Sequence, residues 1–196
     1  MKRIILICVF SLMASVCNAQ EWFTSFDVAK RLALVQNKML FVVWEDSFNY
    51  SIPVYIKVDS RPTVIIDLAK DTSLDPVIWK YFIPVRLSEA KYSDFIQDAK
   101  GRGYKYINKL DDDSIKIMDV NGAILNVNES SGEMVNFYSL INKYSVDTSF
   151  LNFELKNYLD EKNFLTSTLL ALKYIDYAIF TTEELIPEII RLADIY

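Results

Sequence analysis

A run of six apolar residues, MLFVVW at 39–44, constrains the fold of this chain more than any other feature. A short stretch that is apolar at every position is typical of a central strand covered on both faces. The preceding segment carries Val28, Leu32 and Val35 at helical spacing. A helix that leads into a doubly covered strand favours an α/β fold with a central sheet.

Short strand-like and helix-like runs alternate over the next hundred residues. IKIMDVNGAILNV at 115–127 is the clearest of them, because Asn121-Gly122 favours the positive φ angles of a tight hairpin turn. KGRGYKYINKLDDD at 100–113 predicts a polar loop. The other predicted elements are strands at 53–58, 63–67 and 83–87, a helix at 75–82 capped by Thr72 or Ser73, a helix at 88–99 capped by Ser88, and a helix at 132–144.

The first 19 residues have the pattern of an export signal. Lys2 and Arg3 precede the apolar stretch IILICVFSLMASV, which is too short to span a bilayer, and Ala19 offers a small residue for cleavage. Lipoprotein processing at Cys17 is the alternative, but Val16 is larger than the residue that this processing prefers before the cysteine. We therefore expect an exported protein, periplasmic or secreted.

Removal of that segment takes away both cysteines, Cys8 and Cys17, and the chain has no histidine. A chain without these residues cannot form a disulfide, use a thiolate nucleophile or bind zinc through Cys and His. Only four glycines occur, so a glycine-rich phosphate loop is not available either. We expect no cofactor and no metal.

The charge argues against nucleic acid or an anionic membrane as the main partner. The chain carries 21 basic and 26 acidic residues, and loss of Lys2 and Arg3 shifts its net charge from −5 to −7. A basic cluster interleaved with tyrosines at 100–109 resembles a nucleic-acid patch. The overall acidity and the export signal instead favour a loop that contacts a protein partner or nothing. No later segment approaches membrane-spanning length.

From about residue 148 the pattern is wholly helical, with three helices in succession. In the second of them, apolar residues share one face: Leu165, Leu169, Leu172, Ile175 and Ile179. Thr181 and Glu184 fit a capping box for the third helix, while Pro187 favours a kink or a late start near Ile186. This extension either packs back on its neighbours or begins a helical repeat.

The order of predicted elements from 24 to 144 resembles the thioredoxin fold, a mixed central sheet with helices on both faces. FDVAKRLALVQNKMLFVVW is similar to the helix and first core strand of extracytoplasmic thioredoxin-like domains. VIWKYFIPVRL is similar to their short helix and next strand, IKIMDVNGAIL to their closing hairpin, and MVNFYSLINKY to their final helix. The resemblance implies a thioredoxin-like domain at 21–146, followed by a helical extension at 148–196 with a helical-hairpin or repeat-like form.

Active members of that family carry Cys-x-x-Cys directly after the Trp that ends the first core strand, and a cis-proline before the hairpin that faces it. Here EDSF follows the Trp, so Glu45 and Phe48 stand at the cysteine positions, and Ser114 precedes the hairpin. The degenerate active-site positions are Trp44, Glu45, Asp46, Ser47, Phe48 and Ser114. Because thiol–disulfide exchange needs sulfur, the resemblance implies a redox-inactive member.

Two acidic groups have plainer interpretations than catalysis or metal binding. Glu45 and Asp46 are adjacent and point apart on an extended chain, so we expect solvated loop acids. The aspartates at 111–113, with Asp119, do not match the spacing of a calcium-binding loop, and we expect a solvated acidic run without metal.

Phe48 and Tyr50 lie in a polar loop at the edge of the fold that usually faces substrates, and we expect them to contact a partner. The leading interpretation is a non-catalytic, exported thioredoxin-like protein that acts as an interaction or accessory subunit in a bacterial cell envelope. Two alternatives stay open. One is a thiol-independent hydrolase that uses carboxylates such as Glu45 and Asp46, and the other is a chaperone-like binder of unfolded chains.

Overall fold

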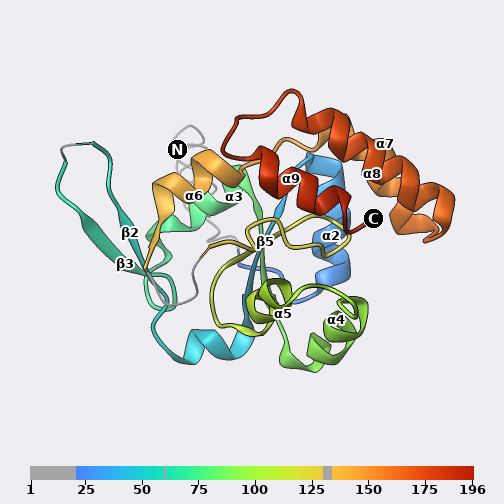
Figure 1. Ribbon diagram of the computed structural model, residues 1–196. Coiled ribbons are helices and arrows are strands. Elements are labelled where there is room, and N and C mark those ends of the chain that lie inside the picture. Colours follow the sequence, from blue (N-terminus) through green and yellow to red (C-terminus); the bar gives the residue numbers. More distant parts are fainter. Residues whose placement is uncertain (1–20, 60, 130–133) are drawn as a thin grey trace, which may run out of the picture.

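The computed structural model describes residues 21–59, 61–129 and 134–196. The predicted export signal at 1–19, with Cys8 and Cys17, lies outside these residues. Within them, helices flank two small sheets in a mixed α/β structure (Figure 1). The α/β fold class is therefore confirmed.

The central sheet is built on β1 (Leu40–Trp44), which is buried at every residue, as its apolar sequence predicts. β4 (Ile83–Leu87) pairs with β1 in parallel, and β5 (Lys116–Met118) pairs with it antiparallel, in the order β4-β1-β5. Two single β-bridges extend the sheet at its edges: Phe23 pairs with Val85 in parallel, and Ile124 pairs with Met118 antiparallel. β1 is therefore enclosed on both edges.

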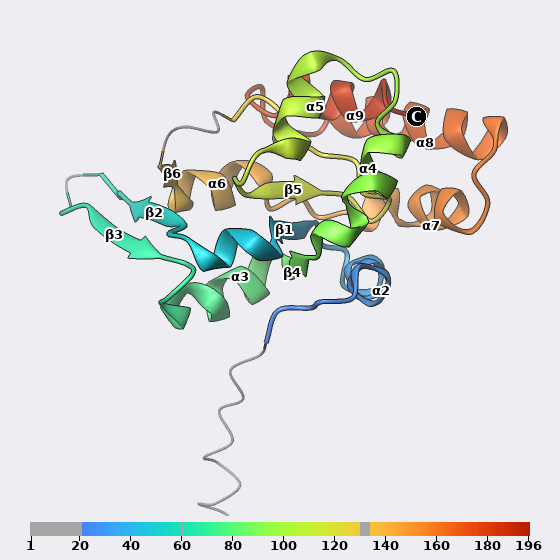
Figure 2. The same ribbon diagram turned by 90° about the horizontal axis from the view of Figure 1, so that it is seen from below.

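Helices cover both faces of this sheet. α3 (Asp75–Tyr81) lies on one side of β1, and α2 (Phe26–Gln36) lies on the other (Figures 1 and 2). α5 (Tyr104–Asp111) and α9 (Ile186–Ala193) lie beyond β5 in Figure 2. The remaining helices are α4 (Tyr92–Asp98), α6 (Phe137–Tyr144), α7 (Asn152–Asp160) and α8 (Phe164–Ala178), and the 3-10 helices are η1 (Glu45–Asn49), η2 (Thr72–Leu74), η3 (Glu89–Lys91) and η4 (Ser149–Leu151).

A second sheet has the order β3-β2-β6. β2 (Pro53–Ile56) and β3 (Val64–Asp67) lie within the strands predicted at 53–58 and 63–67, and they pair as an antiparallel hairpin that projects from the body of the molecule in Figure 1. The short strand β6 (Val135–Asn136), just before α6, pairs with β2 in parallel. β3, on the other edge of β2, is largely open to solvent, with Ile65 61% exposed.

The predicted polar loop at 100–113 is wrong over most of its length, because residues 104–111 form helix α5. Tyr106, Lys109 and Leu110 are the buried residues of this helix. Their helical spacing was hidden because a buried lysine takes the place of an apolar residue in the pattern.

The turn after β5 also differs from the predicted two-residue hairpin. Of Asn121 and Gly122, only Gly122 has a positive φ, at 87°. The Asp119 amide donates to the Ala123 carbonyl at 3.0 Å, and the Gly122 amide donates to the Asp119 carbonyl at 3.0 Å. The loop therefore has three residues, the form in which a type I turn ends on a left-handed glycine.

One predicted helix cap is replaced, and one capping box is new. The Asp71 side chain accepts a hydrogen bond from the Ser73 amide at 2.8 Å and caps η2, so neither Thr72 nor Ser73 caps α3. A capping box joins Asn163, the N-cap of α8, to Thr166 in the first turn of that helix.

The last helix begins late, as its proline predicts. α9 starts at Ile186, with Pro187 in its first turn and Leu185 as its N-cap. Because the helix does not reach back to Thr181, the predicted capping box of Thr181 and Glu184 does not form.

The C-terminal helices pack back on the rest of the chain. α9 lies against α8, and their buried side chains belong to the same continuous core as β1. α8 buries Leu170, Tyr174 and Ala178, which recur at every fourth residue. Residues 148–196 therefore pack directly on 21–146.

Candidate functional site

The end of β1 is closed by Trp44 and by the turn that follows it. The Trp44 side chain is buried, and its indole N–H donates to the Leu110 carbonyl at 2.8 Å. The next residues, Glu45 to Asn49, form the 3-10 helix η1 rather than the start of an α-helix. Glu45 and Asp46 are both exposed, as predicted for loop acids.

Ser47 and Phe48 are held by neighbours from elsewhere in the chain. Ser47 is buried, and its hydroxyl donates to Asp113 at 3.1 Å. The Phe48 ring packs edge-on against Trp22, with 5.2 Å between centroids, and the Arg86 guanidinium lies 4.1 Å from its centroid. Phe48 is therefore half-buried, which leaves less of it for a partner than its polar sequence surroundings suggest.

The expectation of a solvated acidic run holds for Asp111 and Asp113, which are exposed, and is wrong for Asp112, which is half-buried, and for Asp119, which is buried. Asp111 accepts a hydrogen bond from the Tyr92 hydroxyl at 2.7 Å, and Asp113 accepts the one from Ser47. Asp112 accepts from the Ser114 hydroxyl at 2.5 Å and from the Ser114 amide at 2.9 Å. Each carboxylate thus has a separate structural partner.

Two buried lysines face this acidic segment. Lys109 Nζ donates to the Ser114 hydroxyl at 2.6 Å, and Lys116 Nζ donates to the Ser114 carbonyl at 3.0 Å and lies 3.2 Å from the Asp112 carboxylate. Burial lowers the pKa of Lys109, and it lowers the pKa of Lys116 to about 8. The Trp44 ring, 5.7 Å from Lys116 Nζ, closes the other side. Two cations and one carboxylate thus order the segment before β5.

A hollow of about 270 Å³ opens beside this network. It brings together three residues that the sequence singled out, Ser47, Tyr50 and Ser114, with Pro53 and Val135 of the second sheet beside them. Tyr50 is 72% exposed at its rim. Ser47 and Ser114, two of the degenerate positions, are therefore neighbours in space, and the hollow is accessible from solvent.

Sequence reasoning missed a fully buried carboxylate, Asp119. It accepts hydrogen bonds from the amides of Asn121 (2.9 Å) and Ala123 (3.0 Å), and from the hydroxyls of Tyr174 (2.8 Å) and Tyr196. Burial raises the pKa of Asp119, against the opposite effect of its four donors. A lone aspartate beside Asn-Gly carries no sequence signal for this role, because its tyrosine partners are more than fifty residues away.

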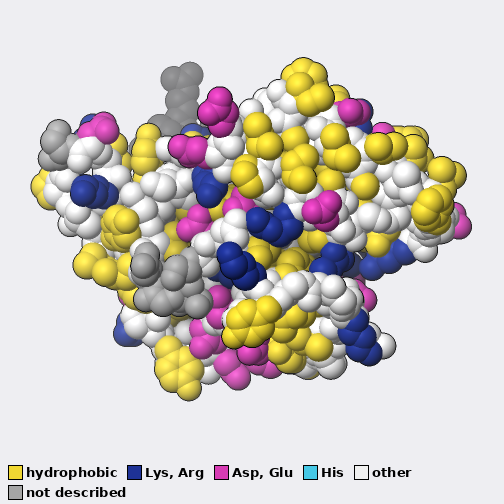
Figure 3. Space-filling view, in the orientation of Figure 1, with side chains coloured by type: hydrophobic (Ala, Val, Ile, Leu, Met, Phe, Trp, Pro, Cys, Tyr) yellow, Lys and Arg dark blue, Asp and Glu magenta, His cyan; other side chains and the backbone are white. Residues whose placement is uncertain are grey.

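The predicted apolar face of α8 exists, and it points outward. We call Leu165, Leu169, Leu172, Ile175 and Ile179 the α8 face. Its members are from 44% to 74% exposed. Phe164 and Phe180, at the two ends of the helix, are 88% and 78% exposed. Figure 3 shows hydrophobic side chains gathered over the C-terminal helices.

Two further properties bear on ligands and membranes. Among residues 21–59, 61–129 and 134–196, no cluster of three or more His, Cys, Asp or Glu side chains is placed to bind a metal ion. In the same part of the chain, no helix combines the length and the hydropathy that a bilayer crossing requires. α8, the longest helix among the described residues, has 15 residues.

No family model, curated protein or solved structure matches this chain. Its function is therefore inferred from its own residues.

Proposed function

We propose that this protein is a non-catalytic, exported, thioredoxin-like protein that acts as an interaction or accessory subunit in a bacterial cell envelope. The export signal, with the localisation it implies, rests on the sequence alone. The fold proposal is supported by a mixed central sheet with helices on both faces, and by contact between two key segments. The Ser47–Asp113 hydrogen bond joins the turn after Trp44 to the segment before β5, which face each other in the family that the sequence resembles.

The proposal of a non-catalytic role is supported by what occupies the cysteine positions. Glu45 is a solvated acid and Phe48 is packed between Trp22 and Arg86. Neither side chain can form the mixed disulfide on which thiol–disulfide exchange depends. We expect the processed protein to leave insulin disulfides intact in the presence of dithiothreitol at a rate no different from buffer. Turnover of thiols by the purified protein would contradict this part of the proposal.

The α8 face carries the interaction proposal. Monomeric soluble proteins rarely expose large contiguous apolar patches, and such patches mark protein–protein or membrane interaction sites. The five members of the α8 face repeat at helical spacing, and both ends carry exposed phenylalanines. The net negative charge of the chain fits a protein better than an anionic membrane. The partner that we propose is therefore an envelope protein with a complementary apolar surface.

The test is a double substitution at the centre of the α8 face. Leu169→Glu with Leu172→Glu should abolish crosslinking to the partner in envelope extracts of the source cell, while the melting temperature stays unchanged. Lys156→Glu, on the neighbouring helix α7, is the control for added negative charge. Retention of the same crosslinked protein by the double variant would overturn the proposal. Light scattering of the purified protein measures its oligomeric state, and a dimer would show that the α8 face is occupied by a second copy of the chain.

A thiol-independent hydrolase is the second candidate, and one observation favours it. Ser114 lines the hollow, and its hydroxyl lies between Lys109 Nζ at 2.6 Å and the Asp112 carboxylate at 2.5 Å. A serine next to a buried lysine is a recognised form of activated nucleophile. Glu45 and Asp46, the carboxylates that the sequence suggested, are exposed on η1.

Ester hydrolysis assays separate the two candidates. Activity on p-nitrophenyl acetate that is lost in Ser114→Ala, and kept in the double variant Glu45→Ala with Asp46→Ala, would support a hydrolase at Ser114. Activity lost only in the double variant would support the carboxylates. We expect neither pattern, because Ser114 already donates its proton to Asp112 within a structural network.

A further inference from the structure

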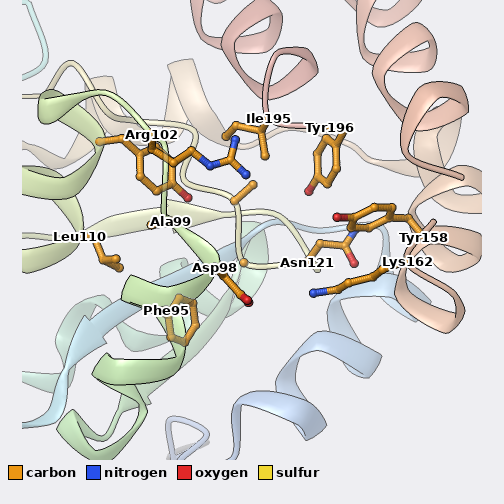
Figure 4. A pocket seen from close by; sticks show the side chains of 13 residues that line it. Phe95, Asp98, Ala99, Arg102, Leu110, Asn121, Tyr158, Lys162, Ile195 and Tyr196 are labelled. Carbon is orange, nitrogen blue, oxygen red and sulfur yellow. The ribbon is translucent and has the colours of Figure 1, made fainter. Parts of the chain in front are cut away.

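A second hollow lies between α4, α5, the turn after β5 and the C-terminal helices (Figure 4). Its volume is about 170 Å³. Pockets that take drug-sized ligands measure roughly 300–1,000 Å³, so this one suits a small molecule. We call it the Asn121 hollow, and its polar or aromatic lining includes Phe95, Asp98, Arg102, Asn121, Tyr158 and Lys162.

Asn121 presents an unsatisfied amide. Both its side-chain nitrogen and its side-chain oxygen are shielded from solvent, and neither has a hydrogen-bond partner within the described part of the chain. The backbone of this residue is fixed, because its amide donates to Asp119 at 2.9 Å and the turn continues through Gly122 at positive φ. A shielded polar group without a partner is unfavourable. A ligand with both a donor and an acceptor would satisfy it.

Charges of both signs line the same hollow. Arg102 lies in the connection between α4 and α5, and Lys162 lies in the connection between α7 and α8. Among residues 21–59, 61–129 and 134–196, no ion pair includes Arg102 or Lys162. Each lies near one ring: Arg102 is 5.5 Å from the Tyr106 centroid, and Lys162 is 5.8 Å from the Tyr158 centroid.

Asp98 supplies the negative charge, from the last turn of α4. Figure 4 shows its carboxylate and the Lys162 ammonium turned toward each other across the hollow, with the Arg102 guanidinium above them. The space between these groups is therefore bordered by two cations and one anion.

We propose that the Asn121 hollow binds a small zwitterion of the α-amino acid type. A simple anion would be repelled by Asp98, and a simple cation would be repelled by Arg102 and Lys162. A molecule with a carboxylate and an ammonium group satisfies both sets of charges. The planar guanidinium of Arg102 is suited to a carboxylate, to which it can donate two parallel hydrogen bonds.

The remaining lining fits the rest of such a ligand. Once the ligand displaces the side chains that cover it, the Asn121 amide can donate to the carboxylate and accept from the ammonium group. The rings of Phe95 and Tyr158 offer apolar walls to a small side chain. The Tyr196 hydroxyl is already bound to Asp119, so this residue serves as a wall. The site does not involve the α8 face and does not depend on the proposed function.

Titration followed by ¹H–¹⁵N NMR tests the site directly. The probes are glycine, L-alanine and L-serine, added one at a time to the processed protein, with acetate and methylammonium as the two halves of a zwitterion. At least one amino acid should shift the Asn121 side-chain amide and the Gly122 backbone amide in a saturable manner, with at least tenfold higher affinity than either half. Absence of saturable shifts with all three amino acids would overturn the proposal, as would equal binding of acetate.

Three substitutions assign the roles of the charges. Arg102→Gln should weaken binding of both the amino acid and acetate at least tenfold. Asp98→Asn should weaken binding of the amino acid at least tenfold and leave acetate binding equal or stronger. Lys105→Gln, which lies outside the hollow, is the matched control and should change neither. Melting temperatures confirm that the variants are folded, and Lys162→Gln replaces Arg102→Gln if the latter is not. Unchanged amino-acid affinity in Asp98→Asn would contradict a zwitterion site.

Discussion

The hydroxyl of Tyr174, on α8, donates a 2.8 Å hydrogen bond to the carboxylate of Asp119, in the turn after β5. The Tyr196 hydroxyl donates to the same oxygen, Oδ2, and the Asn121 and Ala123 amides donate to Oδ1. Asp119 and Tyr174 are both fully buried. One carboxylate thus fixes the turn beside the central sheet and attaches the C-terminal helices to it.

Loss of the Tyr174 hydroxyl should destabilise the whole chain. Tyr174→Phe removes one donor from a buried carboxylate, and we expect the free energy of unfolding in urea to fall by about 1–3 kcal/mol. Tyr138→Phe is the matched control, because Tyr138 is 46% exposed. A loss as small as that of the control would show that Asp119 does not hold the helices in place.

Truncation of two neighbouring leucines of α8 should change the stability by very different amounts. Leu170 is fully buried, so Leu170→Ala should cost about 2–5 kcal/mol in unfolding free energy. Leu169, on the α8 face, is 44% exposed, and Leu169→Ala should change stability by no more than about 0.5 kcal/mol. Chemical denaturation of the two variants measures both values. Comparable losses would mean that the α8 face is covered in the free protein.

Stability should rise with pH between about pH 8 and 10. Burial lowers the pKa of Lys116 to about 8, from 10.5, and it also lowers the pKa of Lys109. In this window the unfolded chain keeps the proton of Lys116 and the folded chain releases it, so higher pH favours the folded state, by up to about 3 kcal/mol for the shift of Lys116. Above pH 10 the trend should reverse, because burial raises the pKa of Tyr174 and Tyr196 and the unfolded chain then loses those protons first.

Urea unfolding at pH 7.5, 8.5 and 9.5 measures this dependence. Lys116→Met should flatten the rise, since it removes the main group that titrates in the window. Lys100→Met, at an exposed position, should leave the rise as it is in the wild type. An equal slope in Lys116→Met would show that Lys116 is not the cause.

The two glycines at positive φ should differ in their tolerance of alanine. Gly101 (φ 86°) has open space around an added Cβ, whereas at Gly122 (φ 87°) that atom would lie 3.1 Å from the Phe95 ring and 3.6 Å from the Phe26 ring. Gly101→Ala should cost about 1–2 kcal/mol from backbone strain alone. Gly122→Ala should cost a further 1–3 kcal/mol or so, because the packed rings must move. Thermal unfolding of both variants tests the difference, and equal losses would contradict it.

Several elements could be predicted because their signals are local. β1 is apolar at all five residues and lies in the centre of the sheet, and the runs at 53–58 and 63–67 contain the expected strands. Pro187 sets the late start of α9, because a proline fits only the first turn of a helix. Periodicity, proline geometry and uninterrupted hydropathy all act within a few residues, so the sequence displays them directly.

Other elements depended on partners that are distant in the chain. α5 was hidden because its buried face includes Lys109. This lysine is tolerated there because the Ser114 hydroxyl accepts its hydrogen bond and the Asp112 carboxylate balances its charge. The sequence also could not show that Tyr92 and Ser47 bind the carboxylates of Asp111 and Asp113, which stay exposed.

The sequence by itself determined the central buried strand, the succession of helices at the C-terminus and the presence of an apolar stripe on α8. Only the tertiary structure decided which stripe of α8 is buried. The contacts of Tyr174 with Asp119 turn Leu170 and Ala178 toward the core and leave the more regular apolar stripe in solvent. Hydrophobic spacing defines two possible faces of a helix, and contacts with distant segments, such as the hydrogen bond of Tyr174 to Asp119 55 positions away and the packing of α8 on α9, fix which face is buried.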